Sequence, residues 1–228
     1  MRLRRSLAAV SFGTSVLLVT ACSMGRGPAP PPPVAPRPAA FIPLGISAPY
    51  LSADVIGGRK ARARKMRAAK IAPLSQANAA VYLAETVREL RVQTAGIGVD
   101  VIRIGDGVLI RIPAAFTFDT GSAALRPQFE ATLNEIARTV KARPKTYVDV
   151  FAHTDTTGTP QVNQALSDKR ASTVAAFLGS RGVTRARIAS KGYGESVPLF
   201  VPDDTETERA ANRRLEIRLV PYRVGDAG

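Results

Sequence analysis

Cysteine and histidine are almost absent from this sequence. Its 228 residues contain one cysteine, Cys22, and one histidine, His153. A single cysteine excludes a disulfide within the chain, and zinc sites rich in Cys and His need several such ligands at set spacings. A catalytic Cys–His pair is excluded too, because Cys22 lies in a segment that we do not expect to fold with the rest. The sequence therefore predicts no metal site.

Acidic side chains are scarce in the first 95 residues. That stretch holds 14 Lys and Arg against 3 Asp and Glu, a net charge of +11, whereas residues 96–228 hold 18 against 15, a net charge of +3. The C-terminal part thus has the mixed charge of an ordinary globular domain, and the basic excess belongs to an N-terminal arm. We expect whatever this arm contacts to be anionic.

The chain begins with the pattern of an export signal. A basic start precedes a mostly apolar stretch that ends in small residues before Cys22. This predicts a secretory signal peptide over residues 1–21, which is too short for a membrane span of about 20 apolar residues. The ending resembles the bacterial lipobox, which implies cleavage before Cys22 and a covalent lipid on its sulfur; the alternative is an ordinary signal peptide with a stray cysteine. Ser23 favours the outer membrane, and no other cofactor is predicted.

Residues 22–73 are expected to form a linker arm. The proline-rich residues 25–38 predict an extended spacer, and residues 41–58 fit no element. Residues 59–70 carry seven basic side chains in twelve positions. This run is either a solvated, partly helical segment or a contact for anionic lipid headgroups, lipopolysaccharide or acidic wall polymer. Because the chain is exported, we expect no nucleic acid partner.

Hydrophobic spacing predicts an amphipathic helix within residues 74–95 and a folded domain over residues 96–228. The domain pattern begins with a hairpin and continues with alternating strands and helices. Strands are expected at 97–104, 108–112, 115–118, 146–152, 186–191 and 215–220, and helices from 127, at 163–180 and at 205–211. This order predicts an α+β fold, a mixed sheet with helices packed on one face.

One aspartate and one arginine stand out in this domain. Asp155 follows the strand expected at 146–152, and Arg170 shares a helix face with the apolar Leu166 and Val174. An arginine on an inward face needs a carboxylate partner, and Asp155 is a plausible one. On these residues alone the pair is either a ligand site or a structural ion pair.

Ordered motifs across the domain resemble the OmpA C-terminal domain family. They are TFDTGSAAL at 117–125, TDTTG at 154–158, NQALSDKRA at 163–171, RIASKGYGESVP at 187–198 and NRRLEI at 212–217. The resemblance implies an OmpA-like βαβαβ sandwich, here preceded by a β-hairpin. Together with the hairpin and the lipobox, it points to the YiaD- and Pal-type outer-membrane lipoproteins of that family.

The resemblance implies non-covalent binding of peptidoglycan through the meso-diaminopimelate of its stem peptide. Asp155 is then expected to take the ammonium of this zwitterion and Arg170 its carboxylate, through charge-assisted hydrogen bonds. The further ligand-binding positions that it implies are Thr154, Asn163, Phe118, Thr120, Gly121 and Arg213. For Asn163 a helix N-cap is the alternative, and one of the paired arginines at 213 and 214 is expected to be structural.

The sequence therefore predicts a binding protein and not an enzyme. The expected function is to tether the outer membrane to the cell wall from the periplasmic face, with peptidoglycan and outer-membrane lipid as partners and other envelope proteins as possible ones. The alternative is a wall-anchoring subunit of an envelope machine, such as a secretion system, motor or efflux assembly. A cell-wall hydrolase is a third hypothesis, which the lack of metal ligands disfavours.

Overall fold

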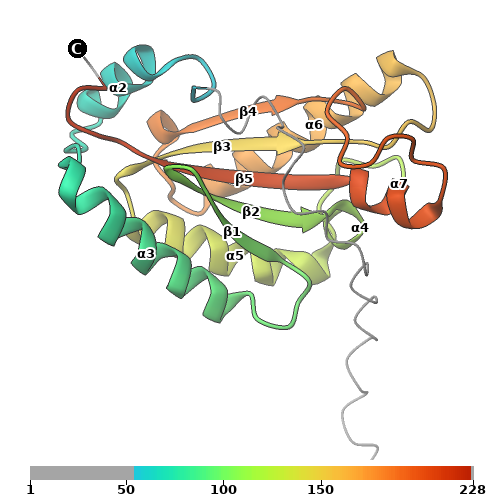
Figure 1. The fold of residues 1–228 in the computed structure, drawn as a ribbon, viewed down its shortest axis with the longest axis horizontal. Helices are drawn as coiled ribbons and strands as arrows, with labels where there is room; N and C mark the ends of the chain where they lie inside the picture. The colour runs from blue at the N-terminus through green and yellow to red at the C-terminus, as the bar shows by residue number, and fades with distance from the viewer. Residues whose placement is uncertain (1–53, 227–228) are drawn as a thin grey trace, which may run out of the picture. The chain divides into compact units, whose positions relative to one another are not determined.

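The computed structural model describes residues 54–226, which are built around one mixed sheet (Figure 1). Its five strands lie in the order β1-β2-β5-β3-β4. Neighbouring strands are antiparallel except β3 and β4, which are parallel. The strands are β1 (Asp100–Ile104), β2 (Gly107–Pro113), β3 (Thr146–Ala152), β4 (Ile188–Gly192) and β5 (Arg214–Pro221). The predicted α+β fold with its leading hairpin is confirmed, whereas the predicted signal peptide and Cys22 lie outside the described residues.

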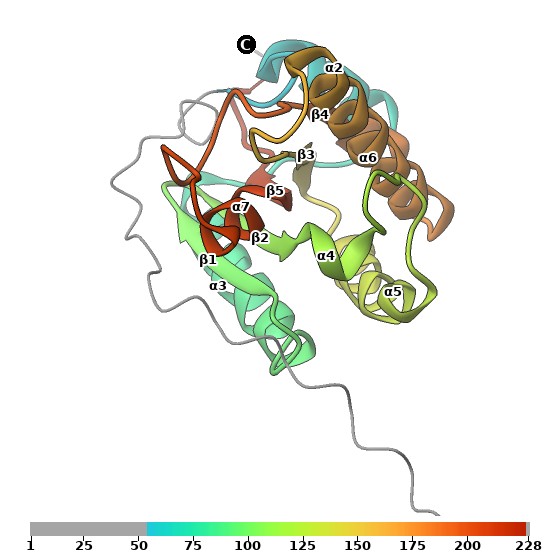
Figure 2. The same cartoon turned by 90° about the vertical axis from the view of Figure 1, so that its right-hand side faces the viewer.

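Three long helices cover one face of this sheet (Figures 1 and 2). They are α3 (Gln76–Gln93), α5 (Pro127–Ala142) and α6 (Pro160–Ser180). Each turns an apolar stripe inward, and in α5 the buried positions recur with the spacing of one helix face. Alternate residues of the strands complete the core, because successive side chains of a strand point to opposite faces.

Glycine at position 192 allows α6 to lie unusually close to β4. A Cβ atom at Gly192 would lie 2.3 Å from the backbone nitrogen of Asp168 and 2.4 Å from the hydroxyl of Ser167. The same contact is tied by hydrogen bonds, since Asp168 accepts from the Gly192 N–H at 2.9 Å and Ser167 accepts from the Gly194 N–H at 2.8 Å. This packing fixes α6, and with it Arg170, against the parallel strand pair.

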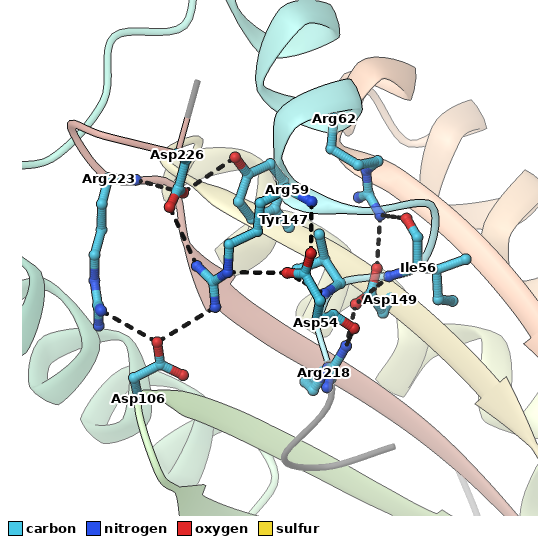
Figure 3. A network of polar contacts seen from close by, with 11 residues as sticks. Asp54, Ile56, Arg59, Arg62, Asp106, Tyr147, Asp149, Arg218, Arg223 and Asp226 are labelled. Atoms are coloured by element: carbon cyan, nitrogen blue, oxygen red, sulfur yellow. Dashed lines mark hydrogen bonds and ion pairs between the residues drawn. The ribbon is translucent and has the colours of Figure 1, made fainter. Parts of the chain in front are cut away.

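The opposite face of the sheet carries buried charges. The Asp149 side chain in β3 is fully buried and accepts hydrogen bonds from Arg62 and Arg218, each at 2.7 Å (Figure 3). Glu216 in β5 is also fully buried and pairs with Arg111 at 2.9 Å and Arg214 at 3.0 Å. Paired in this way, the carboxylates keep hydrogen-bond partners in place of the water they lost on burial.

Helix α2 (Arg59–Ala68) packs on this charged face, although its residues were expected to belong to the linker arm. Its inner side buries Arg62, Ala63 and Met66, and the last two pack with Tyr147 of β3. The expectation that the arm extends to residue 73 is therefore wrong, since Val55 already belongs to the same apolar cluster. A local charge count missed this because the partner of Arg62 lies 87 residues away, in β3.

The short elements complete the fold and include a second correction. Residues 115–118 were expected to form a strand, but residues Ala114–Thr117 form the one-turn helix α4, and only Phe118 bridges to Leu125. A short apolar run does not distinguish a strand from a helical turn. The 3₁₀ turn η1 (Arg185–Arg187) precedes β4, and α7 (Glu206–Asn212) begins with a capping box.

Candidate ligand-binding site

The candidate site begins where β3 leaves the sheet. After Ala152 the main chain continues beside its neighbours, because His153 N–H donates to the Arg214 carbonyl and Thr154 N–H donates to the Gly194 carbonyl, both at 2.9 Å. These bonds place Asp155 just beyond the carboxyl end of β3, with 6% of its surface exposed. The main chain that leads to Asp155 is thus held by hydrogen bonds to both neighbouring segments.

Asp155 makes its ion pair with Arg213 and not with Arg170. Its Oδ2 accepts from Arg213 Nη1 at 2.5 Å, and its Oδ1 accepts from the Thr157 N–H at 3.1 Å. Arg213 also donates to Glu206, whose carboxylate is exposed. Partial burial lowers the pKa of Arg213, but its bonds to Glu206 and Asp155 outweigh that effect and raise the pKa overall.

Arg170 is buried without an ion pair among residues 54–226. Its Nε donates to the Ser122 carbonyl at 2.8 Å and its Nη2 donates to the Asp119 carbonyl at 3.3 Å. The guanidinium carbon lies 5.0 Å from the centre of the Phe118 ring. The direct Asp155–Arg170 pair expected from the sequence is therefore wrong, because main-chain carbonyls and a ring face satisfy this arginine.

The three charged groups nevertheless act on one another. Burial lowers the pKa of Arg170, the nearby positive charge of Arg213 lowers it further, and the negative charge of Asp155 opposes both. One carboxylate and two guanidinium groups therefore share one partly dehydrated region. Such a region suits a ligand that brings both a positive and a negative group.

Asn163 holds the loop between β3 and α6. Its Nδ2 donates to the carbonyls of Asp155 at 3.2 Å and Thr157 at 3.1 Å, and to Glu195 at 2.6 Å. It is not the N-cap of α6, since Thr159 has that position and accepts from the Val162 N–H. Asn163 thus fixes the backbone of the loop that contains Asp155.

The remaining predicted positions differ in their exposure. Phe118 is buried beneath Arg170, and Thr154 is buried with a hydroxyl that has no hydrogen-bond partner in the described part of the chain. Thr120 and Gly121 are exposed in the turn before α5. Gly121 has a φ of 69° in the left-handed region, which favours glycine, and its Cβ position faces open space. At 121 the site therefore offers backbone and no side chain.

Several supporting residues were not found from the sequence. Glu206 lies seven positions before Arg213, about two helical turns away, so helix spacing alone does not predict their contact. Asp203 accepts from the Thr156 N–H at 3.1 Å and from Asn212 Nδ2 at 3.1 Å, so it joins the loop after Asp155 to the residue before Arg213. No local pattern marks Asp203, because both partners come from other elements.

His153 is a structural residue of the strand end. It is buried and stacks on Tyr193, with ring centres 5.5 Å apart and planes 9° apart. Burial lowers its pKa to about 4, with a further lowering by the charge of Arg214 and an opposing effect of Glu216. His153 is therefore neutral near pH 7.

Three further observations describe residues 54–226. Within residues 54–226 there is no group of three or more His, Cys, Asp or Glu placed to hold a metal ion. The same part of the chain has no helix that is both long and apolar enough to cross a membrane. An open hollow of about 560 Å³ lies on α3 and β1 and includes none of the candidate site residues.

Part of the chain matches a known protein family. The model of the OmpA family matches residues 117–213. The probable lipoprotein YiaD of Escherichia coli is 39% identical over 140 residues, which are 61% of this chain and 64% of that protein. The peptidoglycan-binding protein ArfA of Mycobacterium tuberculosis is 40% identical over 105 residues, 46% of this chain and 31% of that protein. The matched part thus spans less than two thirds of either relative.

A solved structure shows the same fold. The cell wall anchor of the T6SS from Pseudomonas aeruginosa aligns with a TM-score of 0.52 and 26% identity, over 61% of this chain and 96% of that chain. The family match includes Phe118, Asp155, Arg170 and Arg213, which the fold brings together at the end of β3. Residues 117–213 of this chain therefore form an OmpA family domain.

Proposed function

We propose that this chain binds peptidoglycan without covalent attachment, through the diaminopimelate of the stem peptide. The observation that carries the proposal is a charged cluster at the end of β3, inside an OmpA family domain. It is formed by the buried Asp155 and Arg170 and the partly exposed Arg213. The free end of diaminopimelate is a zwitterion with one ammonium and one carboxylate. The cluster offers a carboxylate for the first and guanidinium groups for the second.

Each charged side chain has a distinct part in this proposal. Arg170 is held by the Ser122 and Asp119 carbonyls, so its position does not depend on the ligand. Asp155 is held by Asn163 through the backbone, but its Oδ2 is engaged by Arg213 in this structure. The ligand ammonium must therefore share this oxygen with Arg213 or displace it.

Arg213 is suited to such an exchange. Its side chain is 29% exposed, whereas that of Asp155 is 8% exposed, and Arg213 has a second carboxylate partner in Glu206. When an ammonium reaches Asp155, Arg213 can keep its pair with Glu206 or turn to the ligand carboxylate. The total number of ion pairs is then preserved, which keeps the cost of opening the site small.

A lipid on Cys22 completes the proposal. Acyl chains hold a protein on a membrane stably when two or more are present. With the chain held at the outer membrane on its periplasmic face, the domain tethers that membrane to the wall. The similarity to the probable lipoprotein YiaD supports this arrangement.

The test is sedimentation of the full chain with purified sacculi. Asp155→Ala and Arg170→Ala are each expected to weaken binding by about 2–5 kcal/mol, because the ligand charge that the removed side chain would pair with is left without a partner. Asp204→Ala and Lys169→Ala are matched controls, since both side chains are exposed and lie near the site in sequence. Circular dichroism confirms that the variants are folded. If the folded wild-type chain does not sediment, the cluster is structural and the proposal fails.

The same samples test whether the protein acts on the wall. Binding alone leaves the sacculus intact, because no bond is broken. Soluble fragments released by the wild-type chain but not by Asp155→Ala would contradict a purely binding function.

A wall-anchoring subunit of an envelope machine is the second candidate. The similarity to the T6SS cell wall anchor supports it, since that chain is covered over 96% of its length. Affinity purification of the full chain from gently solubilised envelopes separates the two functions. A fixed set of copurified proteins in constant ratio supports the machine, and recovery of the chain with wall fragments alone supports the tether.

A further inference from the structure

Helix α2 presents a basic outer surface that the peptidoglycan site does not use. Five basic side chains are exposed on the helix and its end: Lys60, Arg64, Lys65, Arg67 and Lys70. Three of them, Lys60, Arg64 and Arg67, have the i, i+4, i+7 spacing of one helix face. None of the five has a side-chain hydrogen bond or ion pair with another residue of the described chain, so their charge is not neutralised locally.

This basic surface is held rigidly. Arg62, on the inner side of α2, donates to Asp149 at 2.7 Å and to the Ile56 carbonyl at 3.1 Å (Figure 3). Arg59 reaches Asp54 at 3.0 Å and Asp226 at 3.4 Å, which ties the first turn of the helix to both ends of the described chain. The apolar side of α2 is already buried on Tyr147. The helix therefore offers charge and no free apolar face, so it can contact a surface without inserting into it.

The basic surface and the candidate peptidoglycan site lie at opposite ends of the sheet. Ala63 and Met66 pack where β3 begins, at Tyr147, whereas Asp155 follows the other end of β3. A strand of this length spans about 20 Å. Figure 1 shows α2 at one end of the strands and α7, which precedes Arg213, at the other. A wall bound at Asp155 thus leaves the α2 end facing away from it, a step that rests on the proposed function.

We propose that the outer surface of α2 docks on anionic phospholipid headgroups. Phosphates in a lipid surface complement an array of unpaired Lys and Arg, and each basic residue near such a surface strengthens binding about fivefold. The surface begins at Lys60, 38 residues after Cys22, in the part of the domain next to the arm. The membrane that holds the lipid anchor is therefore within reach of the arm. Docking orients the domain so that its wall site points away from the membrane.

The test is cosedimentation with phospholipid vesicles. The full chain carries Cys22→Ser, so that no acyl group contributes, and the vesicles are phosphatidylcholine with or without about 30% phosphatidylglycerol. Binding to the neutral vesicles measures any contribution of the apolar N-terminal stretch. Lys60→Gln, Arg64→Gln and Arg67→Gln together are expected to weaken binding to the anionic vesicles by about 100-fold. Raising NaCl from about 0.1 M to about 1 M shortens the screening length from about 10 Å to about 3 Å. This change is expected to abolish binding of the wild-type chain to the anionic vesicles.

A second triple variant provides the matched control. Arg88→Gln, Arg103→Gln and Lys169→Gln remove the same charge from other exposed positions, and we expect a change of less than about threefold. Gln keeps high helix propensity, so circular dichroism should show α2 intact. Equal losses for the two triples would overturn the proposal, because net charge alone would then explain binding. If the α2 triple variant lost sacculus binding but kept vesicle binding, the proposal would also be overturned, because wall polymer would then be the partner of this surface. Asp155→Ala keeps vesicle binding, which separates failure of this inference from failure of the proposed function.

Discussion

Replacing Arg62 by Met tests whether α2 is an integral part of the domain. Arg62 and Asp149 have side chains only 5% and 0% exposed and lie 2.7 Å apart. Removing one partner of a buried ion pair costs about 3–5 kcal/mol, because the other charge stays buried. Asp149 keeps Arg218 at 2.7 Å, and Met preserves most of the apolar stem, so the lower end applies, about 3 kcal/mol.

Chemical and thermal unfolding measure this loss. In guanidinium, Arg62→Met is expected to lower the free energy of unfolding by about 3 kcal/mol. For a domain of this size that corresponds to a fall in Tm of about 6–12 °C. Lys60→Met is the matched control, since its exposed side chain has no partner in the described chain and its change should stay within about 0.5 kcal/mol.

The comparison of the two variants can refute the reasoning. If Arg62→Met unfolds at the same denaturant concentration as Lys60→Met, α2 is not part of the cooperative unit and cannot present a rigid basic surface. A double variant with Asp149→Asn adds a second check, because residues in one ion-pair network should show a coupling energy of about 0.5–3 kcal/mol.

Two further predictions concern stability. Because burial lowers the pKa of His153 to about 4, the unfolded chain binds a proton that the folded chain does not bind between pH 6.5 and 4. The free energy of unfolding therefore falls as the pH is lowered through this window, and guanidinium unfolding of His153→Gln should show a smaller fall. An unchanged pH dependence in this variant would argue against His153 as the cause. Gly192→Ala should lower the free energy of unfolding by about 3 kcal/mol through its clash with Asp168, whereas Gly121→Ala, in open space but at a φ of 69°, should cost about 1 kcal/mol. Equal losses in thermal unfolding would refute the close-packing argument.

Local periodicity predicted most of the domain. The strand expected at 146–152 has the same bounds in β3, and α5 begins at Pro127, where its proline predicted the first helical position. These elements were predictable because each buries one face on the same core, so the pattern repeats along the chain. The helix expected from residue 163 begins earlier, at Pro160, because Thr159 caps it and proline is tolerated in the first turn.

The candidate site was predicted as a set of residues, but its ion pair was not. Asp155 and Arg170 do lie in one region, yet the carboxylate pairs with Arg213, 58 residues further along the chain. Helix periodicity showed correctly that Arg170 faces inward. It could not show that the Ser122 carbonyl would meet its guanidinium, because that carbonyl depends on the conformation of the turn before α5.

The place of β5 in the sheet bears on the order in which the sheet can form. This last strand pairs with β2 on one side and with β3 on the other, so it alone joins the hairpin to the parallel pair. Residues Arg214–Pro221 follow the other four strands in the chain, and pairing between strands so distant in sequence is slow to form. Until β5 is made, the sheet can therefore form only as two separate pieces, the hairpin and the parallel pair. A stop codon before residue 214 would leave those pieces without the strand that joins them.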